Sequence, residues 1–145
     1  MNFKNGYNNA MNSREKDIDF NKTIAYWTEG AAYDLDAAQG LFEKRKYPYA
    51  LFFGHLALEK ILKALVVKAT KHHAPYTHSL PVLVSKVTFD IPEETKVKLA
   101  RYMEFFIEAR YPQEQKEFYK KCTKKFVTDN LTEIGKIYQW LKEKL

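Results

Sequence analysis

The sequence predicts an all-α fold, an up-and-down bundle of four long helices plus a short fifth helix. Apolar residues recur at three- and four-residue steps along most of the 145-residue chain, which is the period of an amphipathic helix. Gly and Pro number only five each, so the elements are few and long. Hydrophobic residues make up 46% of the chain and aromatic residues 15%, which is enough for one well-packed core.

The chain divides into an N-terminal tail, residues 1–20, and one helical domain, residues 21–145. The tail is rich in Asn, contains few apolar residues and has no helical period. We therefore expect the tail to be flexible unless a partner or a neighbouring chain orders it.

The first two helices are predicted to form an antiparallel hairpin. The first spans about 21–45, where Leu35 and Phe42 belong to an apolar stripe with helical spacing. The second spans about 48–70 and begins at Pro48, because a proline in the first turn loses no hydrogen bond. The short link between them favours an antiparallel pair. The second helix is apolar nearly all round, so we expect several neighbours or a second subunit to bury it.

Three further helices follow the hairpin. A short one starts at Thr77–Pro81 and ends near 87, the next spans about 90–111 before Pro112, and the last spans about 119–144. The predicted core residues are Ile24, Leu35, Leu58, Leu62, Leu65, Leu83, Val97, Phe106, Ile134 and Leu141.

Charge and cysteine content bound the function only loosely. The net charge of +6 suits an acidic partner such as nucleic acid, a nucleotide phosphate or an acidic protein, although a solvated lysine-rich surface is the simpler explanation. Cys122 is the only cysteine, which fits a reducing cytosol, and the N-terminus has no apolar signal region. No apolar run is long enough for a membrane span, so we expect a cytoplasmic protein.

Common catalytic and metal motifs are missing from the sequence. His72 and His73 are adjacent and their side chains diverge, so we expect neither a metal nor another cofactor. There is no phosphate-binding glycine loop. The lysines around Cys122 are expected to lower its pKa, but a cysteine without a role is the simpler interpretation.

A basic segment near the C-terminus interleaves lysines with aromatic residues. Such a pattern can bind single-stranded RNA, yet helical spacing alone explains the aromatic residues as core, and we favour that explanation. The lysines are Lys116, Lys120, Lys121, Lys124 and Lys125, and the aromatic residues are Phe118, Tyr119 and Phe126.

A polar row interrupts the apolar second helix. His55, Glu59 and Lys63 follow at four-residue spacing, and Lys60 lies beside them. Two interpretations stay open: a Glu–Lys pair that supports the helix, or a charged row that lines a cleft. Arg110, at the predicted end of the fourth helix, can satisfy terminal carbonyls or bind a phosphate, and the structural role is the commoner one.

Four segments, in this order, resemble the HEPN domain (higher eukaryotes and prokaryotes nucleotide-binding). They are residues 32–38, the segment 47–65 with its ALEKxxKA core, the THSL sequence at 77–80 and the ARYP sequence at 109–112. The resemblance covers about residues 22–144. It implies a helical bundle that is usually a homodimer, and many members pair with a minimal nucleotidyltransferase in toxin–antitoxin modules.

Many members of that family are metal-independent ribonucleases with an Arg and a His separated by four to six residues. No Arg in this chain is followed by a His at that distance. The branch that this chain resembles is therefore better described as nucleotide- or RNA-binding. Whether it is an enzyme stays open at this point.

The main hypothesis is a dimeric nucleotide- or RNA-binding domain that works beside a nucleotidyltransferase. The basic side chains of the site would contact phosphate, Glu59 would orient them, and Tyr111 would stack on a base. One alternative is a metal-independent ribonuclease in which Arg110 and His78 or His55 act across a dimer interface. Another alternative is an assembly module without a ligand. The expected ligand-binding residues are His55, Glu59, Lys60, Lys63, His78, Arg110 and Tyr111.

Overall fold

The computed structural model describes residues 19–145, and every regular element in that range is a helix. The predicted all-α bundle is therefore confirmed. The helices are α2 (Phe20–Glu43), α3 (Tyr47–Thr70), α4 (Leu80–Val84), α5 (Glu93–Arg101), α6 (Met103–Glu108), α7 (Lys116–Lys121) and α8 (Lys124–Lys142). The greater part of the predicted tail, residues 1–18, lies outside the described residues.

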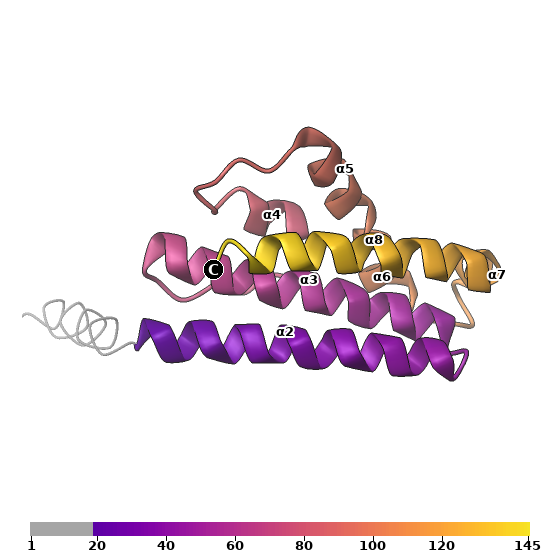
Figure 1. The fold of residues 1–145 in the computed structure, drawn as a ribbon. Helices are drawn as coiled ribbons and strands as arrows, with labels where there is room; N and C mark the ends of the chain where they lie inside the picture. Colours follow the sequence, from indigo (N-terminus) through magenta and orange to yellow (C-terminus); the bar gives the residue numbers. More distant parts are fainter. Residues whose placement is uncertain (1–18) are drawn as a thin grey trace, which may run out of the picture.

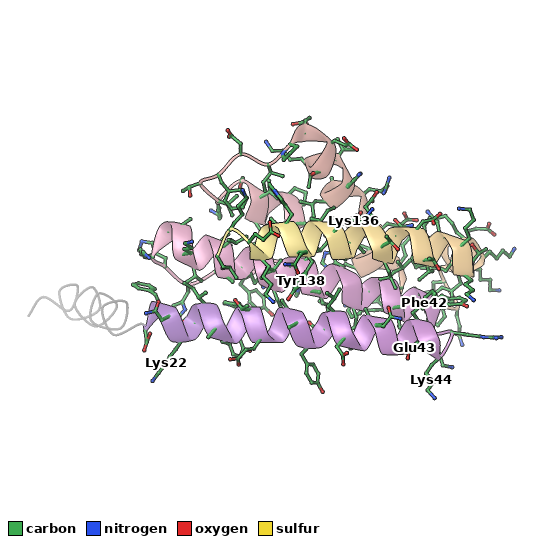
Figure 2. All side chains as sticks on the ribbon, viewed as in Figure 1. Lys22, Phe42, Glu43, Lys44, Lys136 and Tyr138 are labelled. Carbon is green, nitrogen blue, oxygen red and sulfur yellow. The ribbon has the colours of Figure 1, made fainter. Side chains whose placement is uncertain are left out.

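Helices α2 and α3 form the predicted antiparallel hairpin and lie side by side along their lengths (Figure 1). Asp19 begins α2, because its side chain accepts a hydrogen bond from the backbone N–H of Lys22. Arg45 reverses the chain with a positive φ of 60°, and Pro48 occupies the first turn of α3. Lys22 and Lys44 point away from the bundle into solvent (Figure 2).

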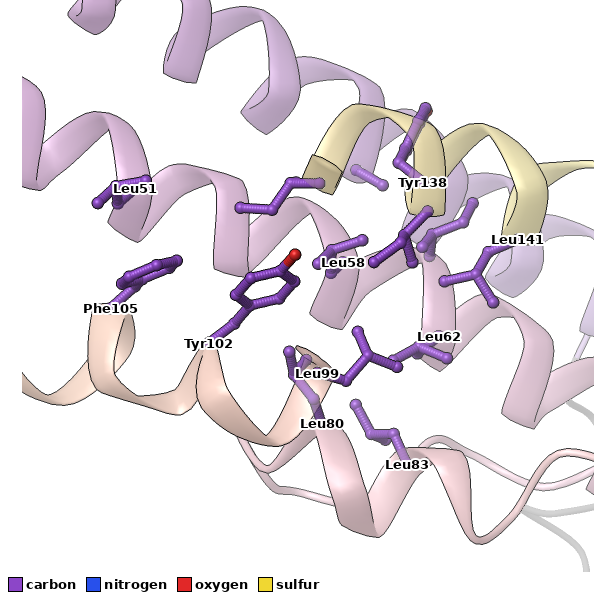
Figure 3. Packing of buried hydrophobic residues seen from close by; sticks show 14 of the residues in the cluster. Leu51, Leu58, Leu62, Leu80, Leu83, Leu99, Tyr102, Phe105, Tyr138 and Leu141 are labelled. Carbon is purple, nitrogen blue, oxygen red and sulfur yellow. The ribbon is translucent and has the colours of Figure 1, made fainter. Parts of the chain in front are cut away.

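Helix α3 is the central helix, as its apolar sequence predicts. It packs against α2, α8, α6 and α4, so neighbours cover nearly all of its sides. Figure 3 shows Leu58 and Leu62 of α3 and Leu141 of α8 pointing into one cluster with Tyr102. All four of these side chains are fully buried. Burying one leucine contributes about 1.5–3 kcal/mol, so this row is a main source of stability.

Three long helices, rather than the predicted four, build the bundle described by residues 19–145. The predicted fourth helix divides into α5 and α6 at Tyr102, where Phe105 N donates to Tyr102 O in a tightened turn. The predicted fifth helix divides into α7 and α8. The helix is interrupted at Thr123. The Thr123 hydroxyl accepts a hydrogen bond from Phe126 N and thereby caps the start of α8.

Six of the ten predicted core residues are fully or almost fully buried: Leu58, Leu62, Leu65, Leu83, Ile134 and Leu141. Ile24, Leu35 and Phe106 are partly buried. The prediction for Val97 is wrong, since 59% of it is exposed. Leu99 is buried instead, and two residues along a helix correspond to about 200° of rotation.

Within residues 19–145, none of the helices combines the length and the apolar character that crossing a membrane requires.

Candidate functional site

A buried carboxylate, Glu59 of α3, is the centre of the candidate site. Only 4% of Glu59 is exposed. Lys63 Nζ lies 3.0 Å from Glu59 Oε1, and His78 Nδ1 lies 3.1 Å and 3.2 Å from the two carboxylate oxygens. A buried charge is tolerated only when it is paired and hydrogen-bonded, and these contacts supply the partners. We call Glu59, Lys63, His78 and the adjacent His55 the Glu59 cluster.

Lys63 is itself almost buried, with 6% exposed. Besides Glu59, its ammonium group lies 4.9 Å from the centre of the Trp27 ring on α2. A cation over an aromatic face is attracted by the ring's negative charge density. Lys63 is therefore held between α2 and α3, and Glu59 and Lys63 form the i,i+4 pair that the sequence allows, in a buried position.

His55 is the innermost member of the Glu59 cluster. It is fully buried, and neither ring nitrogen has a hydrogen-bond partner among the described residues. Nδ1 lies 3.8 Å from Glu59 Oε2, which is too long for a hydrogen bond. Burial lowers the pKa of His55 to about 3, and repulsion from His78 adds to the effect. The imidazole is thus neutral at physiological pH and does not reach solvent.

The backbone conformation just before α4 places His78 beside Glu59. Thr77 Oγ1 accepts from Ser79 N at 3.1 Å, and Ser79 Oγ accepts from Val82 N at 3.3 Å, which caps α4. Leu80, fully buried, anchors the first turn in the core. These bonds hold His78 beside α3, while 49% of its side chain stays exposed to solvent.

Phe106 connects His78 with Arg110. The His78 and Phe106 rings stack, with centroids 4.5 Å apart and an interplanar angle of 25°. The Arg110 guanidinium carbon lies 4.4 Å from the Phe106 ring centroid, and Arg110 Nε donates to Phe106 O at 3.2 Å. Tyr111 is 48% exposed, and its ring lies 5.6 Å from the same guanidinium carbon. Two basic groups and two aromatic rings thus form one continuous surface.

Lys60 does not join the Glu59 cluster. Its ammonium lies 2.7 Å from Oδ2 of the buried Asp34 on α2, an ion pair whose approach angle is poor for a hydrogen bond. A Cβ on Gly30 would lie 3.2 Å from Lys60 Cδ, so the glycine leaves room for the lysine stem. The structure therefore separates Lys60 from the other predicted ligand-binding residues and assigns it to the contact between α2 and α3.

The basic segment near the C-terminus has the structural explanation that its spacing favours. Phe118 is buried, and Tyr119 and Phe126 are partly buried against the core. Its lysines also have acidic neighbours: Lys120 pairs with Glu117, Lys121 with Glu104 and Lys125 with Asp129. These pairs reduce the positive charge that the segment offers to RNA.

Cys122 is buried, and burial raises the pKa of its thiol to about 12. Lys121 acts in the opposite direction, but its effect is smaller. The expectation that the surrounding lysines lower this pKa is therefore wrong. Among residues 19–145, no group of three or more His, Cys, Asp or Glu side chains has a geometry that can hold a metal ion.

Sequence reasoning misses the contributions of Phe106, Trp27 and Asp34. The sequence predicts Phe106 only as a core residue, although its position four residues before Arg110 places both on one helix face. Trp27 and Asp34 lie on the first helix, and no spacing rule relates them to residues of the second. Asp34 does fall within the first of the four segments that resemble the family, which is the one signal for it.

Comparison with known proteins agrees with this architecture. The sequence model of the HEPN domain matches residues 24–145. A solved structure, TT1696 from Thermus thermophilus, is similar with a TM-score of 0.72 and 25% sequence identity, over 84% of this chain and 98% of that one. A comparison with curated proteins gave no match. Because the match to the family covers most of the sequence, the chain belongs to the HEPN domain family.

Proposed function

We propose that this HEPN domain binds the phosphate groups of a nucleotide or of RNA through His78 and Arg110. The observation that supports this most is the position of His78. Its Nδ1 faces the buried Glu59 carboxylate, which fixes the orientation of the ring and can pair with a positive charge on it. Its side chain is nevertheless half exposed, so a ligand can reach the ring.

Arg110 supplies the second phosphate contact in this proposal. Its guanidinium is exposed, and among residues 19–145 no Asp or Glu lies within ion-pair distance of it. Nε is used by Phe106 O, which orients the planar group and leaves its terminal nitrogens for a ligand. A planar guanidinium binds two phosphate oxygens at once. Tyr111, beside it, offers a ring on which a base can stack.

Isothermal titration calorimetry with ATP and with a short single-stranded RNA, at low salt and in EDTA, tests this proposal. Arg110→Gln should weaken binding roughly tenfold or more, because it removes a charge-assisted contact. Lys124→Gln is the matched control, since it removes one charge from the exposed start of α8. No binding at millimolar ligand, or an equal loss in both variants, would overturn the proposal.

The homodimer and the nucleotidyltransferase partner are part of the same proposal. The exposed side chains of Tyr76 and Tyr111 support it, because Tyr76 lies beside His78 and Tyr111 beside Arg110, and both add apolar area that a second chain can cover. Light scattering of the protein alone, and with a minimal nucleotidyltransferase added, measures both assemblies. A mass of one chain at all concentrations would contradict the homodimer. Normal assembly without any nucleotide or RNA binding would favour the pure assembly module.

A metal-independent ribonuclease is a second candidate, favoured by one contact. A carboxylate that holds an imidazole, as Glu59 holds His78, is a common arrangement for a general acid or base. His78 would take the proton of a ribose 2′-hydroxyl, whose oxygen attacks the adjacent phosphorus to form a 2′,3′-cyclic phosphate. The bond between phosphorus and the 5′ oxygen breaks, and that oxygen takes a proton from water to leave as a 5′-hydroxyl. Arg110 would stabilise the charge that develops on the phosphate oxygens.

Cleavage of RNA in EDTA separates this candidate from simple binding. Wild-type protein should generate cyclic phosphate ends, and His78→Asn should abolish them while RNA still binds. RNA that stays intact during long incubation with folded protein would exclude the ribonuclease and leave the binding proposal unaffected.

A further inference from the structure

A cavity of about 360 Å³ opens at the end of the bundle where α3 and α8 both end. It is lined by Leu65, Lys68, Ala69, Thr88, Phe89 and Lys144. Lys63 of the Glu59 cluster precedes Leu65 by two residues on α3, which corresponds to about 200° of rotation, so the two side chains face opposite sides of the helix. The cavity is therefore separate from the candidate site described above.

The inner part of the cavity is apolar. Leu65 is 3% exposed, and Ala69 lies one turn further along α3. The Phe89 ring forms a side wall and is held edge-to-face against Trp140, with ring centroids 5.8 Å apart. Small-molecule sites typically have about 300–1,000 Å³ and mostly apolar walls with a few polar groups. This cavity is at the lower end of that range.

Two ammonium groups lie at the rim. Lys68 Nζ donates to Lys144 O at 2.9 Å and to Leu145 O at 2.6 Å, which fixes its position. Lys144 Nζ lies 5.1 Å from the Trp140 ring centroid and 5.7 Å from that of Phe89. Among residues 19–145, neither lysine has an Asp or Glu side chain within ion-pair distance, and no acidic side chain lines the cavity. Because the oxygens of Lys144 and Leu145 already hold Lys68, the ammonium of Lys144 is the rim cation left for a ligand.

We propose that this cavity binds a small organic anion, one that combines an aromatic ring with an acidic group. The ring enters between Leu65, Ala69 and Phe89, where it leaves water. The acidic group stays at the rim, where the ammonium group of Lys144 and the hydroxyl of Thr88 can bind it. Charge complementarity is the reason to expect an anion, because Lys144 supplies a positive charge at the rim and no acidic side chain lines the cavity.

Fluorescence titration with anilinonaphthalene sulfonate, an aromatic anion, tests the proposal on the whole chain. Phenylnaphthylamine, its uncharged analogue, is titrated alongside. Lys144→Gln should weaken binding of the sulfonate roughly tenfold and leave the uncharged dye unchanged. Lys142→Gln, which removes an equal charge from the exposed end of α8, should change neither. Ala69→Leu, which fills the cavity without changing its charge, should weaken binding of both dyes.

Nuclear magnetic resonance identifies where the dye binds and shows whether it binds the folded protein. Addition of the sulfonate should shift the amide resonances of Ala69, Thr88 and Phe89 and leave those of His55 and Glu59 in place. Equal affinity for the two dyes, equal loss in the Lys144→Gln and Lys142→Gln variants, or shifts confined to other residues would each overturn the proposal.

Discussion

Breaking the buried pair of Glu59 and Lys63 should cost far more stability than removing the pair altogether. Lys63 is only 6% exposed, and the Glu59 carboxylate lies 3.0 Å from its ammonium group. The variant Glu59→Gln removes this negative charge and leaves the ammonium group beside the Trp27 ring. Removing one partner of a buried ion pair typically costs about 3–5 kcal/mol. We expect this loss for Glu59→Gln, a large part of the roughly 5–15 kcal/mol that stabilises a domain.

The double variant Glu59→Leu with Lys63→Met removes both charges and keeps the volume. Replacing a whole buried pair by apolar residues is often neutral or stabilising by about 1–4 kcal/mol, so the double variant should recover most of the loss. His78 loses its partner in this variant, but its exposed side chain can bind water instead. The double variant should fold well and still bind the proposed ligand weakly, which separates stability from function.

Urea denaturation followed by circular dichroism measures these free energies of unfolding, provided that the slopes of the transitions agree. Asp129→Asn is the control, because it breaks the exposed pair with Lys125 and should leave the free energy of unfolding unchanged within error. A loss below about 1 kcal/mol for Glu59→Gln, or a double variant that is no more stable than Glu59→Gln, would contradict the expected cost of an unpaired buried charge.

Three further predictions concern packing, acid stability and thiol reactivity. Gly54→Ala places a Cβ 3.0 Å from Ile134 Cδ1 in the core and should lower the free energy of unfolding by about 1–2 kcal/mol. The Cβ of Gly135→Ala meets nothing within 4 Å, so this variant should raise the free energy of unfolding by about 0.5–1 kcal/mol. Urea titrations that rank the two variants in the opposite order would contradict this packing. His55 has a pKa of about 3 in the folded chain and an ordinary value of 6.5. The unfolded state thus binds more protons below pH 6.5, and the contribution of His55 to stability falls as the pH falls, by about 2 kcal/mol between pH 7.5 and pH 5. His55→Leu should remove that part of the pH dependence, and identical pH profiles would show the assignment to be wrong. Cys122, buried and with a pKa raised to about 12, should react slowly with a chromogenic disulfide reagent in native buffer and at once in urea; rapid native labelling would argue against its burial.

The long helices follow from apolar spacing, but their interruptions do not. The periods that predict α2 and α3 reflect burial along one continuous surface, and such periods are visible in the sequence. The break at Thr123 depends on a hydroxyl that caps Phe126 N, and the turn at Tyr102 lets both Tyr102 and Phe105 reach α3. The helical period of the apolar residues continues through both interruptions, so the period does not reveal them. Tertiary packing determines whether the helix continues or breaks at these positions.

The candidate site is predictable from the sequence only within one helix. Four-residue spacing correctly places His55, Glu59 and Lys63 on one face of α3, because that geometry is local. The same spacing does not determine the partner that a lysine finds on another helix, so it groups Lys60 with the row although Lys60 pairs with Asp34. The role of Phe106 depends likewise on a contact across the fold.

In the proposed function, His78, held by Glu59, is the imidazole that contacts phosphate. The four histidines of the chain allow one direct test, a nuclear magnetic resonance titration of all imidazole resonances with a short single-stranded RNA in EDTA. The ring signals of His78 should shift to saturation as RNA is added, while those of the exposed His72 and His73 should not. RNA binding that moves His72 and His73 and leaves His78 unchanged would contradict the proposal.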